Sequence, residues 1–362
     1  MRVLIIFNHP APYKVSVFNE LAKYVDLTVL FERSKAKDRP DSFYHVNRYD
    51  FNHIIFKKGY VGKEGSITNE VKNYVKKHHQ KFDVILMNGY SHLAEIKTIK
   101  YLHRHHIKFG LLINGGIIRK KEFFLKKAYK KSLIKKASYY ISPSKESNKY
   151  LEYYGADSSR IYNYYYSNYS QSEISFANSE QKLLYRKKYN LPLDKKIFIN
   201  PSQFIERKNN LYLISLFKDR EDYLLLVGEG NQLHKYQEYI AQNNMNNVII
   251  MPFKSKDELF ELYKASDVHI TLSKEDIFGH TVLESFSNGI PVISSRSVIS
   301  SLEYVKDGYN GYLVDLNDKE SIIKAIDNVN ESFNKNALES AKETTFENSA
   351  LSIYEVLKKE YE

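Results

Sequence analysis

Two acidic residues lie on either side of an expected helix start in the stretch Thr271–Pro291, TLSKEDIFGHTVLESFSNGIP. Asp276 falls on the turn after an apolar run, and Glu284 lies one turn inside a helical pattern that Gly289 and Pro291 end. The first amides of a helix lack carbonyl partners and carry partial positive charge, so they favour an anion. Acids beside such a site could accept hydrogen bonds from hydroxyl groups. The pattern suits a ligand with phosphate and sugar, although a helix start with a favourable acid would explain the same residues structurally.

A second segment could bring a positive charge to the same ligand. Residues 201–209, PSQFIERKN, join an apolar run to a helical pattern, and Lys208 lies close to the start of that helix. A lysine there could bind a diphosphate as a donor and a charge. The sequence contains no Asp-x-Asp and no cysteine. It therefore predicts no nucleotide-sugar metal site of that kind, no Cys-based metal site and no disulfide.

Strand-length apolar runs alternate with helical patterns in both halves of the chain, which predicts two α/β domains, each built on a doubly wound parallel sheet. A polar stretch at 168–181 separates the halves as a linker would. The expected strands in the first half are Val3–Phe7, Leu27–Phe31, Val84–Met87, Phe109–Ile113 and Tyr139–Ile141, with helices near Lys14–Tyr24, Ser66–Lys77, Leu93–His105 and Arg119–Lys136. In the second half the expected strands are Ile197–Asn200, Tyr223–Val227, Val248–Met251, Val268–Leu272, Val292–Ser294 and Tyr312–Val314, and the expected helices are Asn209–Phe217, Gln232–Asn243, Lys256–Ala265, His280–Asn288 and Lys319–Asn330.

Polar, glycine-containing turns follow the expected strands of the first half. Ligands bind at the carboxyl ends of the strands in such sheets, so these turns are candidates for a second binding site. The residues singled out on them are His9, Asn88, His92, Asn114, Gly115 and Gly116. Ordinary turn chemistry explains most of them individually. No G-x-G-x-x-G follows the first strand, so a dinucleotide fingerprint is absent.

Positive charge is concentrated in residues 1–167, which hold 31 Lys and Arg against 14 Asp and Glu. Within them, the segment 119–136, RKKEFFLKKAYKKSLIKK, has nine basic residues and one acid. A helical wheel places Leu125, Ala128, Tyr129 and Leu133 on a face that can pack on the sheet. The opposite face carries Phe123 and Ile134 among Lys120, Lys126, Lys127, Lys130 and Lys131. This arrangement suits an anionic membrane surface better than nucleic acid, and the alternative is a solvated basic helix.

Five blocks of the second half resemble the retaining glycosyltransferases of family 4, and they occur in the family's order. The blocks are QFIERKN (Gln203–Asn209), LLLVGEGNQL (Leu224–Leu233), VIIMPFKSKDELFELYKASDVHITLS (Val248–Ser273), EDIFGHTVLESFSNGIPVISS (Glu275–Ser295) and DGYNGYLVD (Asp307–Asp315). Weaker similarity covers YISPS, YLEYYGADSSRI and the final FENSALSIYEVLKKEY.

The resemblance implies the GT-B fold, in which two Rossmann-like domains face each other across a cleft. The acceptor-binding domain would span residues 1–167 and the nucleotide-sugar-binding domain residues 168–343. A terminal helix, residues 344–362, would cross back to the first domain.

The resemblance also assigns roles to residues of the second half. Lys208 would neutralise the donor diphosphate, Glu284 would accept from the ribose hydroxyls, and Asp276 would accept from hydroxyls of the transferred sugar. The family usually has glutamate where this chain has Asp276, and often arginine where it has Gln203, so Arg207 is the candidate for a second positive charge. The amides of His280, Thr281 and Val282, next to Phe278 and Gly279, would meet the phosphates. Gly228 and a nucleobase-flanking loop with Phe253 and Lys254 complete the expected donor site.

The expected protein is therefore a retaining glycosyltransferase in cell-surface polysaccharide synthesis, independent of a metal or other cofactor. It would move a sugar from a nucleotide sugar, with UDP favoured over GDP, to a hydroxyl of a glycan or lipid-linked acceptor. The basic helix predicts a cytoplasmic protein held peripherally at the inner face of the membrane. Two alternatives remain open at this point: a non-catalytic GT-B partner of another transferase, and a nucleotide-sugar epimerase.

Overall fold

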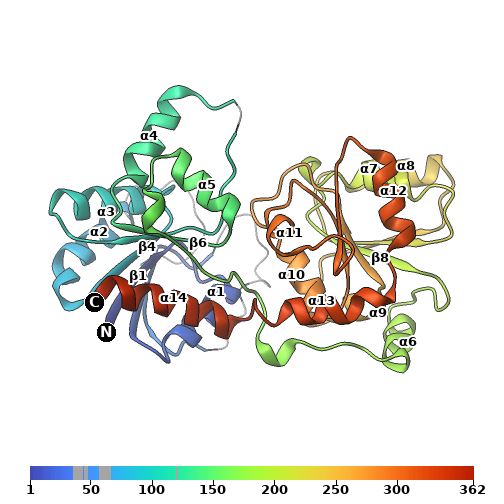
Figure 1. Ribbon diagram of the computed structural model, residues 1–362, viewed down its shortest axis with the longest axis horizontal. Helices are drawn as coiled ribbons and strands as arrows, with labels where there is room; N and C mark the ends of the chain where they lie inside the picture. Colours follow the sequence, from blue (N-terminus) through green and yellow to red (C-terminus); the bar gives the residue numbers. More distant parts are fainter. Residues whose placement is uncertain (36–43, 45–47, 57–66, 120) are drawn as a thin grey trace. The chain divides into compact units, whose positions relative to one another are not determined.

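The computed structural model describes residues 1–362 except 36–43, 45–47, 57–66 and 120, and it divides the chain into two compact units (Figure 1). Unit 1 consists of Met1–Asn168 together with Thr345–Glu362, and unit 2 consists of Tyr169–Thr344. Ser66 of the first-half helix prediction and Lys120 of the basic face lie outside the described residues.

Unit 1 contains a parallel sheet whose described strands run in the order β3-β2-β1-β4-β5-β6-β7. The strands are β1 (Arg2–Phe7), β2 (Asp26–Phe31), β3 (Asn52–Ile55), β4 (Val84–Asn88), β5 (Gly110–Leu112), β6 (Tyr139–Ser142) and β7 (Ile161–Asn163). The helices are α1 (Pro12–Leu21), α2 (Ile67–His78), α3 (Leu93–Arg104), α4 (Phe124–Ile134), α5 (Lys145–Tyr153) and α14 (Phe346–Tyr361). The strand order reverses between β1 and β4, so the carboxyl ends of these two strands flank the crevice where such sheets bind ligands.

The last helix, α14, packs on unit 1 although it follows unit 2 in sequence. Its Glu360 accepts from Arg160 at 3.0 Å and from the hydroxyl of Tyr162 at 2.7 Å. Tyr354 stacks on Tyr24 with ring centroids 5.0 Å apart. Charged and aromatic contacts therefore fix the C-terminal helix to the N-terminal unit.

Unit 2 contains a second parallel sheet, with the strand order β10-β9-β8-β11-β12-β13. Its strands are β8 (Ile197–Pro201), β9 (Tyr223–Val227), β10 (Val248–Met251), β11 (Val268–Thr271), β12 (Val292–Ser295) and β13 (Gly311–Val314). Its helices are α6 (Ser179–Lys188), α7 (Asn210–Leu216), α8 (Leu233–Gln242), α9 (Lys256–Ala265), α10 (His280–Ser287), α11 (Ile299–Tyr304), α12 (Lys319–Asn328) and α13 (Asn334–Ala341). The order reverses between β8 and β11, which places the segments after these strands at a ligand-binding switch point.

The apolar runs predicted every strand of unit 2: β8, β9, β11 and β12 are buried within the parallel sheet, and the partly buried edge strand β10, VIIM, also contains a continuous apolar run. Two strands of unit 1, β3 and β7, were missed. Both lie at sheet edges and are half exposed, so neither contains a continuous apolar run. The expected linker was also too long at its end, since α6 begins at Ser179. Asn178 and Gln181 form a capping box there, a signal that the sequence already carried.

The helix expected over Arg119–Lys136 is shorter and turned differently in the structure. α4 begins at Phe124, and its buried residues are Leu133 and Ile134 at its C-terminal end. Leu125 and Tyr129, which were expected to pack on the sheet, are exposed. Among the described helices, no segment is both long and apolar enough to cross a membrane.

Candidate functional site

The loop after β8 is held by close backbone contacts that only glycine permits. Gly228 has φ +150°, and a Cβ atom on it would lie 2.0 Å from the carbonyl oxygen of Ser202. Gly230 has φ +155°, and its Cβ would lie 2.4 Å from the carbonyl oxygen of Phe204. The amide of Phe204 donates to Glu229 O at 2.7 Å, and its ring is buried. The two glycines therefore fix the segment that leads to Lys208.

Lys208 meets Asp276 at the carboxyl edge of the unit 2 sheet. Asn209 adopts a left-handed conformation (φ +59°) and its side chain donates to Leu272 O at 3.1 Å, which joins the loop after β8 to the end of β11. Lys208 Nζ then forms an ion pair with Asp276 Oδ2, and both side chains are mostly buried, with 12% and 14% exposed. Arg207 NH1 lies 3.8 Å from Asp276 Oδ1 and donates to the carbonyl oxygen of Glu275 at 3.0 Å. Two cations thus converge on one carboxylate.

The start of α10 lies next to this ion pair. Gly279, the residue before the helix, has φ +91°, and a Cβ on it would lie 3.7 Å from Asp276 Oδ2 and 2.4 Å from Val298 Cγ1. His280 and Thr281 begin the helix, where amides have no carbonyl four residues back to bond. The third amide expected to bind phosphate, that of Val282, donates to Gly279 O at 3.3 Å. The first two amides are therefore the better placed donors for an anion.

Glu284 is tied to the same helix start by a tyrosine that the sequence did not single out. The hydroxyl of Tyr263, on α9, reaches Glu284 Oε2 at 3.3 Å and the carbonyl oxygen of Thr281 at 3.1 Å. Burial, followed by the charge of Glu284, raises the pKa of Tyr263 well above its usual range, so the hydroxyl keeps its proton and donates. The block LYKASDV carried this tyrosine, but nothing local indicated its partner.

The remaining residues that the sequence predicted to bind the donor lie on neighbouring loops of the same edge. Gln203 belongs to the loop after β8, and Phe278 is buried just before α10. Phe253 and Lys254 follow β10, two strands away from β8, and Phe253 is 43% exposed. Lys254 Nζ bonds to Glu258 at 3.2 Å, within the first turn of α9. The structure thus brings Lys208, Arg207, Asp276 and Gly279 into one cluster, with Phe253 and Lys254 further along the edge.

We expect Gly279→Ala to destabilise unit 2. The substitution places a side chain at positive φ and against Val298. The matched control is Gly308→Ala, because Gly308 also has positive φ (+71°) but no atom within 4 Å of its Cβ position. Strain alone should cost Gly308→Ala about 1 kcal/mol, and the clash should cost Gly279→Ala roughly 1–3 kcal/mol more. Urea unfolding measures both, and equal losses would contradict the packing described here.

His269 lies beneath this site as a buried neutral imidazole. It is fully buried on β11, its Nδ1 bonds to Ile199 O at 3.0 Å, and its ring packs edge-on to Tyr263. Burial lowers its pKa to about 4. The unfolded chain therefore binds this proton first as pH falls, so the stability that the neutral ring contributes is complete above about pH 6.5 and is lost progressively toward pH 4.

We accordingly expect the free energy of unfolding of the parent protein to fall between pH 6.5 and 5 with a His269 contribution of up to about 1.4 kcal/mol per pH unit. His269→Gln should remove that part of the slope, whatever its effect on stability at pH 7. His234→Gln, at an exposed position of α8, is the control and should leave the slope unchanged. Urea unfolding at a series of pH values measures the three slopes. If the free energy of unfolding depended on pH equally in the parent, His269→Gln and His234→Gln, the role of His269 would be contradicted.

The candidate residues of unit 1 gather at the switch point between β1 and β4. His9 follows β1, Asn88 ends β4, His92 precedes α3, and Asn114 follows β5. Asn88 is 3% exposed, and within the described residues neither atom of its amide has a hydrogen-bond partner. A buried amide without partners carries a large desolvation cost, so Asn88 is the strongest ligand-binding candidate in this unit.

Gly115 and Gly116 follow Asn114 but differ in role. Gly115 has φ +137°, which allows the turn. A Cβ on Gly116 would lie 2.4 Å from the ring of Tyr150, so Gly116 serves packing.

A buried charged cluster adjoins these residues and was not predicted. Arg33 and Glu32 directly follow β2, are almost fully buried and lie 3.5 Å apart. Arg33 NH2 lies 3.1 Å from His92 Nδ1, and Glu95 accepts from the amides of His92 (3.0 Å) and Ser91 (2.6 Å). Burial raises the pKa of Glu95 to about 7. The charged pair after an apolar strand, FER, was the available sequence signal.

Not all of the proposed membrane-contact residues in the segment 119–136 are exposed. Phe123, Lys126 and Lys131 are exposed. Lys127 donates to the Tyr153 hydroxyl at 2.6 Å, and Lys130 pairs with Glu122 at 2.6 Å. Ile134 is fully buried in the core of unit 1, so its assignment to a membrane-facing surface was wrong. The wheel failed because it assumed that the lysine-rich side of the helix would face outward along its whole length.

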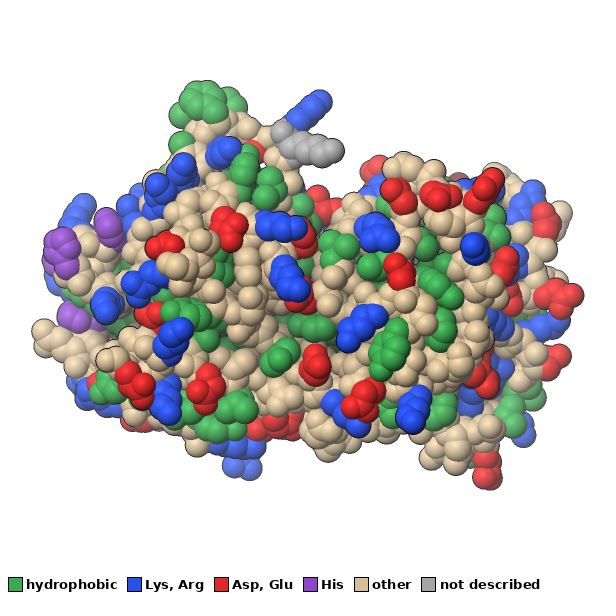
Figure 2. Space-filling model, viewed as in Figure 1, with side chains coloured by type: hydrophobic (Ala, Val, Ile, Leu, Met, Phe, Trp, Pro, Cys, Tyr) green, Lys and Arg blue, Asp and Glu red, His purple; other side chains and the backbone are tan. Residues whose placement is uncertain are grey.

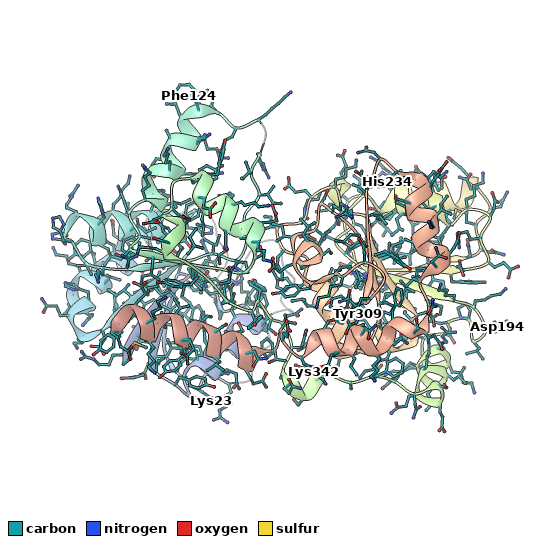
Figure 3. The ribbon with its side chains drawn as sticks, viewed as in Figure 1. Lys23, Phe124, Asp194, His234, Tyr309 and Lys342 are labelled. Atoms are coloured by element: carbon teal, nitrogen blue, oxygen red, sulfur yellow. The ribbon has the colours of Figure 1, made fainter. Side chains whose placement is uncertain are left out.

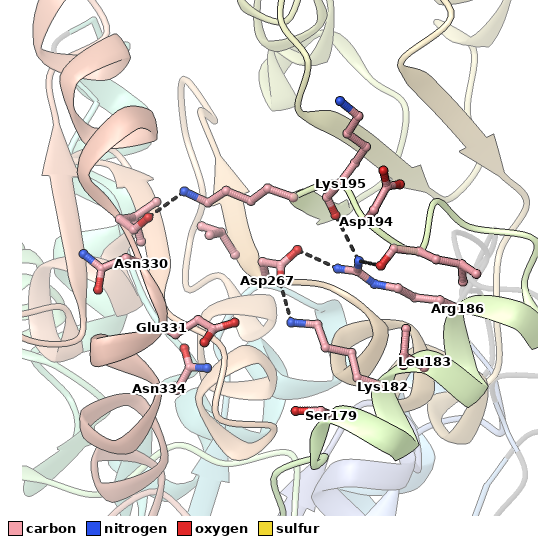
Figure 4. Close-up of a pocket in the computed structure, with 14 residues that line it drawn as sticks. Ser179, Lys182, Leu183, Arg186, Asp194, Lys195, Asp267, Asn330, Glu331 and Asn334 are labelled. Carbon is pink, nitrogen blue, oxygen red and sulfur yellow. Dashed lines mark hydrogen bonds and ion pairs between the residues drawn. The ribbon is translucent and has the colours of Figure 1, made fainter.

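A pocket of about 510 Å³ lies at the opposite, amino-terminal edge of the unit 2 sheet (Figure 4). Asp267 accepts there from Arg186 at 2.7 Å and from Lys182, and Arg186 also donates to carbonyl oxygens of Ala265, Leu193 and Lys195. These bonds attach α6 to the base of the sheet. The pocket thus has a structural explanation and lies apart from the cluster around Lys208. Among the described residues, no group of three or more His, Cys, Asp or Glu side chains could hold a metal ion.

Comparison with known proteins identifies the fold. Residues 181–344 match the family model described as glycosyl transferases group 1. Over 99% of this chain and the whole of the other, the structure resembles Anabaena HepE in complex with UDP, with a TM-score of 0.80 and 16% sequence identity. It also resembles a sucrose-phosphate synthase from Thermosynechococcus elongatus, with a TM-score of 0.79 over 100% of this chain and 99% of that one. The chain therefore has GT-B architecture, and the matched residues 181–344 of unit 2 are similar to the group 1 glycosyl transferases.

Three curated relatives that this chain resembles are also named as glycosyltransferases. The chain is 28% identical to the uncharacterized glycosyltransferase MJ1178 of Methanocaldococcus jannaschii, over 42% of this chain and 45% of the relative. It is 30% identical to the lipopolysaccharide core biosynthesis glycosyltransferase LpsE of Rhizobium meliloti, over 40% and 42%. It is 25% identical to the O-antigen biosynthesis glycosyltransferase WclY of Escherichia coli, over 61% and 63%. Each match thus spans less than two thirds of the relative.

Proposed function

We propose that the protein is a retaining glycosyltransferase that moves a sugar from a nucleotide sugar to a hydroxyl of a glycan or lipid-linked acceptor in cell-surface polysaccharide synthesis. The observation that carries the proposal is the cluster at the β8/β11 switch point. It joins Lys208, Asp276 and the first turn of α10, with Glu284 one turn further along. The cation and the amides would bind a diphosphate, and the two carboxylates would accept hydrogen bonds from sugar hydroxyls.

The donor is proposed to be a UDP-sugar. Residues 181–344 of unit 2 are similar to the group 1 glycosyl transferases, and the structurally similar HepE was solved with UDP, with UDP-glucose, and with UDP and glucose. The half-exposed ring of Phe253 after β10 is available to flank a base. The role in surface polysaccharides is proposed from the relatives named for lipopolysaccharide core and O-antigen synthesis.

The proposed chemistry relies on electrostatic stabilisation of the leaving group. Negative charge builds on the nucleoside diphosphate as the bond to the anomeric carbon breaks. Lys208 and the amides of His280 and Thr281 would stabilise that charge. Glu284, oriented by Tyr263, would hold the ribose, and Asp276 would hold the transferred sugar. The acceptor hydroxyl would attack from the face that the leaving group occupied and would pass its proton to the departing diphosphate, which gives retention without a protein nucleophile.

The acceptor is proposed to bind in unit 1 at the β1/β4 switch point. The buried amide of Asn88 offers one donor group and one acceptor group to a ligand. His92, held by Arg33, would orient a hydroxyl.

Two measurements with the purified chain test the proposal. Calorimetry with UDP and with GDP should show binding, stronger for UDP. UDP-sugars should release UDP only when the purified protein and the membrane extract are both present. Nucleotide binding without transfer to any extract would instead favour a non-catalytic partner of another transferase. Conversion of the donor sugar without an acceptor would indicate an epimerase.

A further inference from the structure

Three consecutive apolar side chains are exposed at the N-terminal end of α4. Phe123, Phe124 and Leu125 are 65%, 68% and 57% exposed. In Figure 3, Phe124 lies at the free end of α4, which projects away from the sheet of unit 1. We call Phe123, Phe124 and Leu125 the apolar tip. Figure 2 shows apolar side chains gathered at this projecting end, with Lys and Arg side chains beside them.

The rest of the helix holds the apolar tip away from the core. Leu133 and Ile134, at the other end of α4, are buried in the core of unit 1, and the hydroxyl of Tyr140 donates to Ile134 O at 2.9 Å. Glu122, just before the helix, accepts from Lys130 Nζ at 2.6 Å and from the Tyr154 hydroxyl. These two attachments brace both ends of the helix, so the apolar tip cannot fold back without breaking them.

The exposed charged side chains of the segment that carries the apolar tip are basic. Lys121, Lys126 and Lys131 are exposed, and we call them the basic collar. The one acid of the segment 119–136, Glu122, is already paired with Lys130. Lys127 donates to the Tyr153 hydroxyl and Lys130 is paired with Glu122, so neither lysine belongs to the collar. The collar has the charge that anionic lipid headgroups attract, and the apolar tip has side chains that enter the interface.

We propose that the protein docks on an anionic lipid surface through the end of α4, with the apolar tip inserted at headgroup level and the basic collar against the headgroups. The helix enters end-on and does not lie along the membrane, because Ile134 at its other end is buried. Such binding would place unit 1 at the negatively charged cytoplasmic leaflet. The docking requires neither donor nor acceptor, so it stands or falls independently of the proposed function.

Tryptophan fluorescence tests insertion directly, because the chain has no tryptophan of its own. Phe124→Trp should show a blue-shifted emission with vesicles of phosphatidylcholine containing roughly 30% phosphatidylglycerol, and no shift with phosphatidylcholine alone. Leu184→Trp is the control, because Leu184 is 59% exposed on α6 of unit 2. An unshifted emission from Phe124→Trp, in protein that sediments with the anionic vesicles, would overturn insertion and leave only surface adsorption.

Vesicle sedimentation tests the two parts of the surface separately. Replacing the three residues of the apolar tip by serine should lower the vesicle partition coefficient at least tenfold. Lys→Glu at the three collar positions should lower the partition coefficient as much and should remove its dependence on salt concentration. The matched controls are Leu183→Ser with Leu184→Ser, and Lys→Glu at exposed Lys218, Lys235 and Lys319. These controls should bind like the parent. Urea unfolding shows that each variant is folded, and parent-like partitioning of the serine variant would overturn the proposal.

Discussion

Replacement of Lys208 by alanine should lower kcat/KM for sugar transfer by about 100- to 1,000-fold. The amine lies at the carboxyl edge of the unit 2 sheet, next to the first turn of α10, where the departing diphosphate is proposed to gather charge. Removing one preorganised donor from such a site typically has an effect of about this size on the rate. The comparison is steady-state transfer by the variant and by Lys218→Ala, whose lysine is exposed after α7.

The ion pair requires a second variant. Lys208→Ala leaves Asp276 mostly buried with only Arg207 nearby, at 3.8 Å, so part of the loss could come from a disturbed loop. Lys208→Arg keeps the charge but changes the geometry, and should recover part of the rate while urea stability stays near the parent value. If Lys208→Ala transferred sugar at the parent rate, the proposed role in leaving-group stabilisation would be wrong.

Asp276→Ala should abolish measurable transfer while the Kd for UDP changes by less than about threefold. The proposal assigns Asp276 to the transferred sugar, which UDP lacks. The variant also releases Lys208 from its ion pair, so more of that cation is available to the diphosphate. A threefold change in Kd corresponds to about 0.65 kcal/mol of binding free energy. The loss of the Asp276 carboxylate and the release of Lys208 act in opposite directions, so we expect a net change no larger than that.

Calorimetry with UDP and transfer assays with the same preparation make the test for Asp276. Asp222→Ala serves as the control because Asp222 pairs with Arg220 before β9, away from the switch point. Loss of UDP binding together with transfer would refute the division of labour between Asp276 and Glu284. Asp276 would then act by positioning Lys208 for the diphosphate.

The sequence by itself determined that the chain forms two α/β units, and it supplied the candidate residues for the proposed donor site. Buried parallel strands need continuous apolar runs, so β8, β9 and β11 could be predicted, and the glycines at 228 and 279 marked turns that the structure shows at positive φ. The edge strands β3, NHII, and β7, IYN, contain no such run, which explains why they were missed, whereas the edge strand β10, VIIM, does contain one. Local patterns therefore sufficed wherever burial is uniform along an element.

Only the tertiary structure decided which side chains meet and which face outward. Lys208 and Asp276 are 68 residues apart, as are Arg207 and the carbonyl of Glu275, and no local pattern pairs them. Tyr263 reaches Glu284, and Arg33 reaches His92, for the same reason: strand order at the switch points brings distant loops together. The exposed end of α4 likewise depends on where the rest of unit 1 ends, because a wheel gives the faces of a helix but not how far the core extends along it.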